Sequence, residues 1–487
     1  MHYTVKTFSL DGISARPVRI EVDIHRALPG FAIVGLPDVA VGEARERVRA
    51  ALVNRGFEFP LSRIVVNVAA ASLGKAGPTM DLAIAVGILG ASGQIDGEAL
   101  SRFSFVGELG LDGSVRPILG ALPIAEAACE AGAEAIVVPV ESGPEAALAV
   151  GVDLVPLTDV GELPVLVAGT RPPAPEPLSL RLDAAHGAPD LADLRGQSLL
   201  RRALEVAAAG GHDLLIVGPP GAGKSIAASR LPSILPPLDG DEALEVARIA
   251  SATGRIGAGS PSGRPFRAPH HTISVAGLIG GGVPLRPGEI TLADRGVLFL
   301  DELCEFRWDA LEALRAPRET GVMTITRGGE SHLLPSRFML VAASNPCPCG
   351  RGDDDPRCTC DPGTLGRRAR LLGGLSSMFD VVCRAETPSL ADLGGGAPGE
   401  SSAEVADRVV RARVAQDDRL GPGRTNAEMT VEEIRDAGLS TDLQGRPDAG
   451  PGLEHRLRVA RTLADLDGSD LVTTAHFDEA ARLRRWR

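Results

Sequence analysis

The sequence predicts an α/β protein with an N-terminal α/β domain, a core built on a parallel sheet, and a C-terminal helical lid. An apolar run from Leu214 to Val217 stops at a glycine-rich turn, and an alanine-rich helical segment begins at Ile226. A second apolar run ends in Asp301 and Glu302, and the carboxyl ends of parallel strands are where α/β folds place ligands. Helical periodicity dominates the last part of the chain.

The length of 487 residues predicts about three domains. Apolar residues make up 44% of the chain and charged residues 23%, an ordinary globular composition. The formal net charge of −13 argues against a protein that binds polyanions over its whole surface, so contact with nucleic acid would need a local basic region. The first residues lack the apolar core of a signal peptide and no apolar run could span a membrane, so we expect a cytoplasmic protein without a membrane partner.

Residues 1–165 alternate β-branched runs with alanine-rich runs, which predicts a separate α/β domain. Residues 166–189 follow as a proline-rich linker. Within the first domain we expect strands at 19–24, 63–68 and 135–140 and helices at 42–54 and 81–91.

The core is expected to cover residues 190–386, beginning with a helix at 190–209 whose Leu199, Ala203 and Val206 share one face. The turn that follows its first strand matches the phosphate-binding pattern G-x-x-x-x-G-K-[ST]. Such a loop surrounds a polyphosphate with backbone N–H groups, while Lys224 reaches the terminal phosphates and Ser225 holds Mg²⁺. A chance glycine-rich turn is the alternative, which the flanking strand and helix make improbable. The predicted nucleotide-binding residues are Gly218, Pro219, Pro220, Gly221, Ala222, Gly223, Lys224 and Ser225.

Polar residues at two further strand ends complete this prediction. Asp301 would orient Mg²⁺ and Glu302 would polarise the attacking water; a solvated strand end is the alternative, which the preceding glycine-rich loop disfavours. A third apolar run at 338–343 brings Asn345 to the same sheet edge, where it could bond the γ-phosphate or the water. Lys224, Glu302 and Asn345 are therefore the candidate catalytic residues, with ATP and Mg²⁺ as cofactors.

Four cysteines lie close together after Asn345, at Cys347, Cys349, Cys358 and Cys360. Four thiolates in so short a stretch could surround Zn²⁺ tetrahedrally, although C-x-C is tighter than the usual C-x-x-C spacing. Reduced free thiols are an equally good interpretation.

The residues between the two halves of the predicted site carry arginines and two adjacent histidines. Side chains of adjacent residues diverge on a strand or a helix, so we expect His270 and His271 to be structural. Arg264, Arg267 and Arg286 flank a glycine-rich run and could contact phosphates, or could lie in an ordinary solvated loop.

A second linker at 387–402, rich in glycine, proline and serine, precedes a helical region at 403–487. Helices are expected at 403–416 and 454–466, and a last helix should begin at Ala475 with Thr474 as its cap. The arginines at the end of that helix would suit its negative pole: Arg482, Arg484, Arg485 and Arg487.

Two stretches of the first domain, 75–81 and 105–113, resemble the proteolytic domain of Lon protease. That resemblance implies a serine and lysine dyad, but Thr79 and Pro123 stand at the two positions here. Because no base remains to activate a nucleophile, we expect a Lon-like domain without proteolysis.

The whole chain resembles the Mg-chelatase-like AAA+ ATPases typified by the competence protein ComM, also called YifB. The stretches that carry the resemblance are 30–38, 218–225, 264–271, 296–303, 345–350 and 459–466. The resemblance implies a Lon-like domain, an AAA+ module, a homo-hexameric ring, and ATP-driven movement along branched DNA during uptake and recombination. Its chelatase cousins instead drive Mg²⁺ insertion into porphyrins.

The chain departs from the pattern of that family at three places. Met378 occupies the position of an arginine finger, Gly452 stands where a lid arginine is expected beside an insertion at 441–451, and Ala316 and Arg318 replace a glutamate and a leucine. Arg370 and Arg384 are nearby substitutes for the finger. A poorly hydrolysing regulatory or assembly subunit, or a chelatase-like remodeller of a protein partner, are therefore alternatives to a DNA motor.

Overall fold

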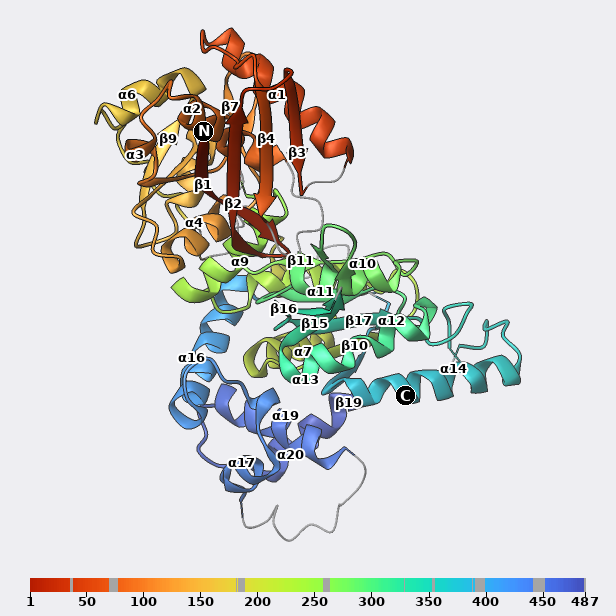
Figure 1. Ribbon diagram of the computed structural model, residues 1–487. Coiled ribbons are helices and arrows are strands. Elements are labelled where there is room, and N and C mark those ends of the chain that lie inside the picture. Colours follow the sequence, from red (N-terminus) through yellow and green to blue (C-terminus); the bar gives the residue numbers. More distant parts are fainter. Residues whose placement is uncertain are drawn as a thin grey trace.

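The computed structural model places three bodies along the molecule: an N-terminal α/β body, a central sheet with its helices, and a helical body that contains the last helices (Figure 1). The description covers residues 1–35, 38–69, 78–180, 182, 189–256, 263–327, 329–352, 355–387, 389, 399–440 and 452–485. Among the helices of these residues, none has the length and apolarity that a membrane crossing requires. Most of the expected linker at 387–402 and the whole insertion at 441–451 lie outside the described residues.

The N-terminal body is a mixed seven-stranded sheet in the order β3-β4-β2-β1-β5-β8-β9. Its central strands bury one face: Val18, Ile20 and Val22 of β2 are buried and alternate with more exposed residues. Helices α2 and α4 cover β1 and β2. The strands are β1 (His2–Asp11), β2 (Ser14–His25), β3 (Gly30–Val34), β4 (Arg63–Ala69), β5 (Phe103–Phe105), β8 (Ala135–Pro139) and β9 (Asp153–Leu157), with the small hairpin β6 (Glu108–Leu109) and β7 (Val115–Arg116) beside them.

The helices of this body are amphipathic or fully apolar according to their position. The sequence of α2 is almost entirely apolar because nearly all of its residues are buried between the sheet and α1. The helices are α1 (Asp38–Asn54), α2 (Asp81–Ser92), α3 (Gly97–Leu100), α4 (Ala121–Glu130), α5 (Gly143–Ala146) and α6 (Leu163–Val167). The five elements that the sequence predicts in this region are confirmed to within a few residues.

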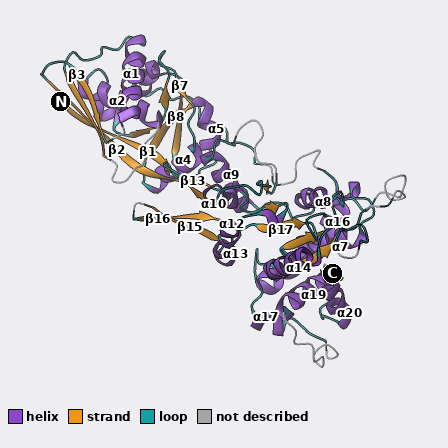
Figure 2. Ribbon diagram, turned by 90° about the vertical axis from the view of Figure 1, so that its right-hand side faces the viewer, coloured by secondary structure: helices purple, strands orange, loops and turns teal. Residues whose placement is uncertain are grey.

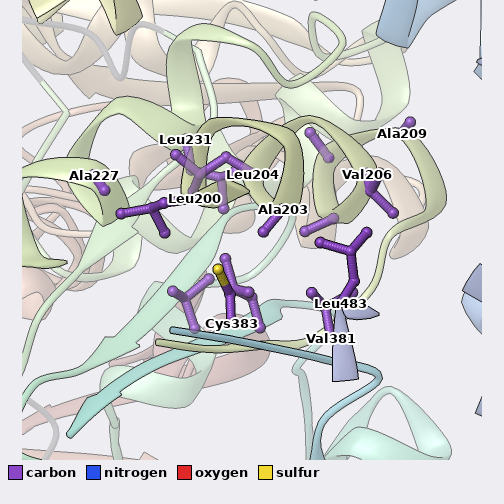
Figure 3. Close-up of a cluster of buried hydrophobic side chains, with 14 of the residues drawn as sticks. Leu200, Ala203, Leu204, Val206, Ala209, Ala227, Leu231, Val381, Cys383 and Leu483 are labelled. Atoms are coloured by element: carbon purple, nitrogen blue, oxygen red, sulfur yellow. The ribbon is translucent and has the colours of Figure 1, made fainter. Parts of the chain in front are cut away.

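The central sheet is parallel throughout and has the order β11-β14-β17-β10-β18-β19. The sequences of its strands are short continuous apolar runs, because helices cover both faces of the sheet. In Figure 3, side chains of α7 lie above Val381 and Cys383 of β18. The strands are β10 (Leu214–Val217), β11 (Phe266–Arg267), β14 (Val297–Leu300), β17 (Met339–Ser344), β18 (Val381–Arg384) and β19 (Arg484–Arg485). The predicted α/β fold class with a parallel-sheet core is confirmed.

Three helices of this sheet, α7, α9 and α14, are longer than the rest, and α14 projects from the body in Figure 1. The helices are α7 (Ser198–Gly210), α8 (Lys224–Arg230), α9 (Gly240–Ala252), α10 (Val275–Ile279), α11 (Glu289–Leu292), α12 (Trp308–Glu312), α13 (Arg315–Thr320) and α14 (Pro362–Leu375). Two hairpins stand outside the sheet, β12 (Gly280–Gly281) with β13 (Arg286–Pro287), and β15 (Val322–Arg327) with β16 (Glu330–Pro335).

The first helix of the core differs from its prediction, because α7 begins at Ser198 and not at residue 190. Gln197 has a left-handed backbone with φ 54°, which no helix interior accepts, so residues 191–193 form only a separate 3₁₀ turn. The predicted buried face is also corrected, since Leu199 is 41% exposed and Leu200 is the buried neighbour.

The last body consists of α16 (Ser402–Leu420), α17 (Val431–Asp436), α19 (Leu453–Leu466) and α20 (Thr474–Arg482). Thr473, and not Thr474, is the cap of α20. Arg484 and Arg485 leave the helix and form strand β19 on the edge of the central sheet, so they do not extend the helical end as expected. This pairing follows from tertiary contact with β18, which no local pattern encodes.

The N-terminal body is joined to the core by specific contacts. Arg248 of α9 makes a bidentate pair with Glu126 of α4, with nitrogen to oxygen distances of 2.7 and 2.8 Å. Ile13, in the turn between β1 and β2, is buried in the same apolar cluster as Leu278 and Leu334 of the core. Buried apolar contact together with a bidentate charge pair resists relative motion of the two bodies.

One buried acid of the core predicts how stability depends on pH. Burial, helped by the nearby charge of Glu245, raises the pKa of Asp294 to about 7. One of its oxygens accepts the backbone N–H of Arg337 at 2.7 Å, while the other is buried without a hydrogen-bond partner. An unfolded aspartate titrates near pH 3.9. Ionisation of this carboxylate therefore lowers the free energy of unfolding. This destabilisation is absent below about pH 4, grows between the two pKa values, and is complete above about pH 7.

We expect Asp294→Asn to raise the free energy of unfolding relative to wild type at pH 8, because asparagine carries no charge into the same site. The advantage should shrink by about 2 kcal/mol at pH 5.5, since each pKa unit corresponds to about 1.4 kcal/mol. Urea unfolding at both pH values, followed by tryptophan fluorescence, measures the difference. Asp436→Asn, an exposed acid of α17, is the control; an advantage independent of pH for Asp294→Asn would contradict the assignment.

Candidate nucleotide-binding site

Three adjacent parallel strands bring the predicted site residues to one edge of the central sheet. Strand β17 lies between β10 and β14, with Val217 opposite Ser344 and Leu300 opposite Ala342. All three strands therefore end together, so the glycine-rich loop, the two acids and Asn345 emerge side by side. This is the sheet edge at which ligands bind in open α/β folds.

The glycine-rich loop leaves β10 and turns into α8 through two residues that need a left-handed backbone. Gly221 and Gly223 have φ angles of 79° and 77°, which a residue with a Cβ adopts only at a cost. Lys224 begins α8 and folds back over the loop, where its ammonium donates to the carbonyls of Gly218 at 2.8 Å and Pro219 at 2.9 Å. Burial lowers its pKa, partly offset by the carboxylates of the acidic strand end. The loop thus holds a cation beside the glycine-rich turn, as phosphate binding requires.

Asn345 and Gln197 fasten this loop from two sides. The Asn345 side-chain oxygen accepts from the Lys224 ammonium at 3.0 Å, which links β17 to the loop. Gln197 donates to the carbonyls of Ala222, at 3.2 Å, and of Glu386. No sequence pattern selects Gln197, because its role depends on the left-handed backbone that turns its side chain toward the loop.

Ser225 and Asp301 form the contact that best fits a magnesium site. The serine hydroxyl donates to the aspartate carboxylate with an oxygen to oxygen distance of 2.6 Å. A hydroxyl and a carboxylate are hard oxygen donors of the kind that Mg²⁺ takes alongside phosphate oxygens and water. These two residues would hold Mg²⁺ between them, and the ion would supply charge neutralisation for the phosphates.

Glu302 lies next to Asp301 in an unusual conformation, with φ 56° in the left-handed region. A side chain other than glycine in this region carries strain of about 1–3 kcal/mol, and such residues cluster at functional sites. The glutamate side chain is 53% exposed, and one of its oxygens lies 3.3 Å from Nδ1 of His271. The site therefore contains a histidine that the sequence did not predict as functional.

The expected divergence of the two histidines is wrong. They lie in a turn between β11 and α10, where the rings of His270 and His271 approach to 4.1 Å with an angle of 34° between their planes. Adjacent side chains diverge on strands and helices, but they need not diverge in a turn. A signal was present in the sequence, since polar residues that follow a strand adjacent to the acidic strand arrive at the same sheet edge.

The four clustered cysteines come together and are all free thiols. Their sulfur atoms lie within 4.8 Å of one another, with Cys347–Cys349 at 3.3 Å, Cys349–Cys358 at 3.5 Å and Cys347–Cys358 at 3.8 Å. Tetrahedral zinc with Zn–S bonds of about 2.3 Å separates sulfurs by about 3.8 Å, so the spacing fits.

Hydrogen bonds around the cysteines favour negative sulfur. The backbone N–H groups of Arg351 and Thr359 lower the pKa of Cys349 to about 6. Although the Cys360 backbone favours its thiolate, desolvation and the neighbouring sulfurs raise the pKa of Cys358 to about 12. The surroundings thus favour negative charge on Cys349 and oppose it on Cys358, and a divalent cation would relieve that opposition. These four residues would hold Zn²⁺ and fix the start of α14, which follows directly.

The arginines of the predicted loops divide into internal and exposed groups. Arg264 is committed to the Pro236, Pro237 and Arg295 carbonyls and to Glu242, and Arg267 to a bidentate pair with Glu289. Their suggested phosphate contacts are therefore corrected to structural roles. Arg286 in the β12–β13 hairpin is exposed, as is Arg370 on α14.

The departures from the AAA+ pattern are physically connected. Arg318 donates to the Met378 carbonyl at 2.6 Å and also pairs with Asp213. Its guanidinium is thus held inside the subunit, while the Met378 side chain packs on the apolar cluster of the core. Gly452 caps α19 with a left-handed backbone and lies against Arg484.

The residues at the Lon-like dyad positions lie in different settings. Thr79 is half-buried in a 3₁₀ turn, Pro78–Met80, and Pro123 is buried inside α4. Proline offers no side-chain base, so the described geometry gives Thr79 no partner at that position for activation.

Comparison with known proteins shows what the chain is similar to over nearly its whole length. Residues 190–392 match the family described as magnesium chelatase, subunit ChlI, and residues 20–142 match a second description of the same subunit. An uncharacterized protein of Mycobacterium tuberculosis strain H37Rv is 41% identical over 98% of this chain and 96% of its own. The uncharacterized protein YifB of Escherichia coli K12 is 40% identical over 99% of this chain and 96% of its own. The competence protein ComM of Haemophilus influenzae is 38% identical over 97% of this chain and 95% of its own.

We expect the purified protein to carry about one zinc ion per chain, because four sulfurs at tetrahedral spacing form a closed structural site. Cys358→Ser should remove most of the metal and lower the melting temperature, since binding energy at such a site is folding energy. Metal analysis by mass spectrometry measures this. Cys129→Ser, in the N-terminal body, should retain its zinc; a wild-type protein free of metal with four titratable thiols would overturn the assignment.

Proposed function

The chain belongs to the Mg-chelatase-like AAA+ family of YifB and ComM, and from this premise we propose that it is an ATP-driven motor acting on DNA. ATP would bind at the glycine-rich loop, residues 218–225, with Mg²⁺ held by Ser225 and Asp301. Glu302 would act as the base that polarises the attacking water, and Asn345 would orient that water or the γ-phosphate. The domain division at residues 165, 189, 386 and 402 is part of this proposal.

The observation that carries the proposal is the hydrogen bond between Ser225 and Asp301 at 2.6 Å. It joins the end of the loop to the acidic strand at the point where P-loop enzymes hold their metal. The Lys224 ammonium and the Asn345 oxygen, 3.0 Å apart, lie at the same edge. Cationic, acidic and amide groups thus converge where a bound triphosphate would place its terminal group.

DNA as the substrate has support from the relatives and from one surface feature. The ComM relative carries the description competence protein. Arg286 is exposed on a glycine-rich hairpin, which suits contact with a phosphate backbone despite the net charge of −13. We propose that a homo-hexameric ring in the cytoplasm gathers six such hairpins around the DNA and so concentrates positive charge locally.

A second candidate is a nucleotide-binding regulatory or assembly subunit that hydrolyses ATP slowly. The observation that favours it is Met378, whose apolar side chain packs inward at the position of the finger. A remodeller of a protein partner is a third candidate, supported by the magnesium chelatase description of the matched family. The three share the same nucleotide site and differ in rate and in partner.

We expect the wild-type protein to hydrolyse ATP faster in the presence of a four-way DNA junction. Glu302→Gln should lower the turnover by about 100-fold or more, because glutamine cannot polarise water as a base. A phosphate-release assay with and without the junction measures both effects. Glu312→Gln, an acid of α12 outside the site, should leave the rate unchanged. A wild-type protein that does not bind DNA, and whose ATP turnover DNA does not raise, would contradict the motor. A wild-type protein that does not bind ATP in the presence of Mg²⁺ would contradict all three candidates.

Met378→Arg distinguishes the motor from the slow regulatory subunit. If the missing finger limits hydrolysis, the arginine should raise turnover by about 100-fold or more, within the range for such residues. Met378→Gln, similar in length but uncharged, is the control and should not raise it. Wild-type turnover at the rate of ordinary AAA+ enzymes, unchanged by the arginine, would remove the case for a slow subunit.

A further inference from the structure

We propose that His271 is a positioning residue that holds the Glu302 carboxylate in place for hydrolysis. This role rests on the proposed function, because it presumes that Glu302 acts on the attacking water. Two features of Glu302 itself show that it needs such support. Its backbone is in the left-handed region at φ 56°, and its side chain is 53% exposed. A long, exposed side chain samples many rotamers unless a neighbour fixes it.

The neighbour that can fix it is His271. Nδ1 of its ring lies 3.3 Å from Oε2 of Glu302, close enough to pair with the carboxylate when that nitrogen carries a proton. Within the described residues, His271 is the one side chain that pairs with the Glu302 carboxylate through an ion-pair or hydrogen-bond contact. Glu302 has therefore a single lateral restraint, and that restraint comes from the segment after β11.

The His271 ring is itself held on both sides, which makes it a suitable restraint. His270 stacks on it at 4.1 Å, and the buried Phe306 meets it edge-on at 6.4 Å with an interplanar angle of 73°. His270 is fixed in turn by the Thr272 hydroxyl, 2.9 Å from its Nδ1. A group that must orient a reacting carboxylate works only if its own position is locked by packing and by a second layer of contacts.

Strand pairing fixes where this segment begins. Strand β11 pairs in parallel with β14, with Arg267 opposite Leu298, so both strands point toward the same sheet edge. The bidentate pair between Arg267 and Glu289 anchors the end of β11. The turn that carries His271 then continues into α10 and the β12–β13 hairpin. Strand pairing thus fixes where the turn that carries His271 begins, and the ring contacts with His270 and Phe306 hold the turn beside Glu302.

Two substitutions of His271 separate its polar contact from its packing. His271→Asn keeps an N–H at the same distance from the backbone but removes the stacked ring, whereas His271→Leu keeps apolar bulk against Phe306 and removes the N–H. We expect His271→Leu to lower kcat for ATP tenfold or more, with KM and the calorimetric affinity for ATP within twofold of wild type. His271→Asn should recover most of the rate. His332→Asn, a core histidine that pairs with Asp11 away from Glu302, is the matched control.

The outcomes separate this inference from the proposed function. Hydrolysis by wild type that Glu302→Gln abolishes, with His271→Leu slow and His271→Asn active, supports the positioning role. The reverse order of the two variants, or a parallel loss of ATP affinity, shows a packing role and overturns it, as does a His271→Leu protein that hydrolyses at the wild-type rate. In those cases the proposed function stands. A wild-type protein without any ATP hydrolysis overturns both together.

Discussion

The hydrogen-bond register between β10, β17 and β14 is the constraint on which the candidate site depends. Because the three strands are parallel and end together, residues more than 120 positions apart in the sequence meet at one edge, as the contact between Lys224 and Asn345 illustrates. A shift of one residue in any strand would turn its side chains to the opposite face and separate the loop from the acids. Apolar side chains buried on both faces of the sheet add packing contacts that hold this register.

Much of this site could be predicted from the sequence because its chemistry is local. The glycine-rich loop, Asp301 and Asn345 are each recognised from a few residues beside a strand, and a parallel sheet brings such strand ends together. The role of His271 could not be predicted in the same way, because it depends on a turn that stacks two rings against Phe306. The role of Gln197 could not be predicted for a similar reason, since only its left-handed backbone directs its side chain to the loop.

The fold shows the same division between local and tertiary determinants. Strand β2 is predictable from its alternating burial, and α2 is predictable from the length of its apolar run. The start of α7 and the end of α20 are set by a single backbone conformation and by pairing with another strand, which periodicity does not report. Arg318 and Met378 belong together in the same sense: two departures that look independent in the sequence are joined by a hydrogen bond across the core.

The short strand β19 has a mechanical consequence for the helical body. Residues 484 and 485 follow α20 and pair with β18, and Arg484 also donates to the carbonyls of Phe379 and Asp380. The helical body is therefore attached to the central sheet by the covalent chain and by this edge pairing, and it also packs on α7 through α16 and α19. It cannot swing about a single hinge. Any rotation of these helices must either twist β18, which runs beside the strand that carries the phosphate loop, or break the pairing of β19 with β18.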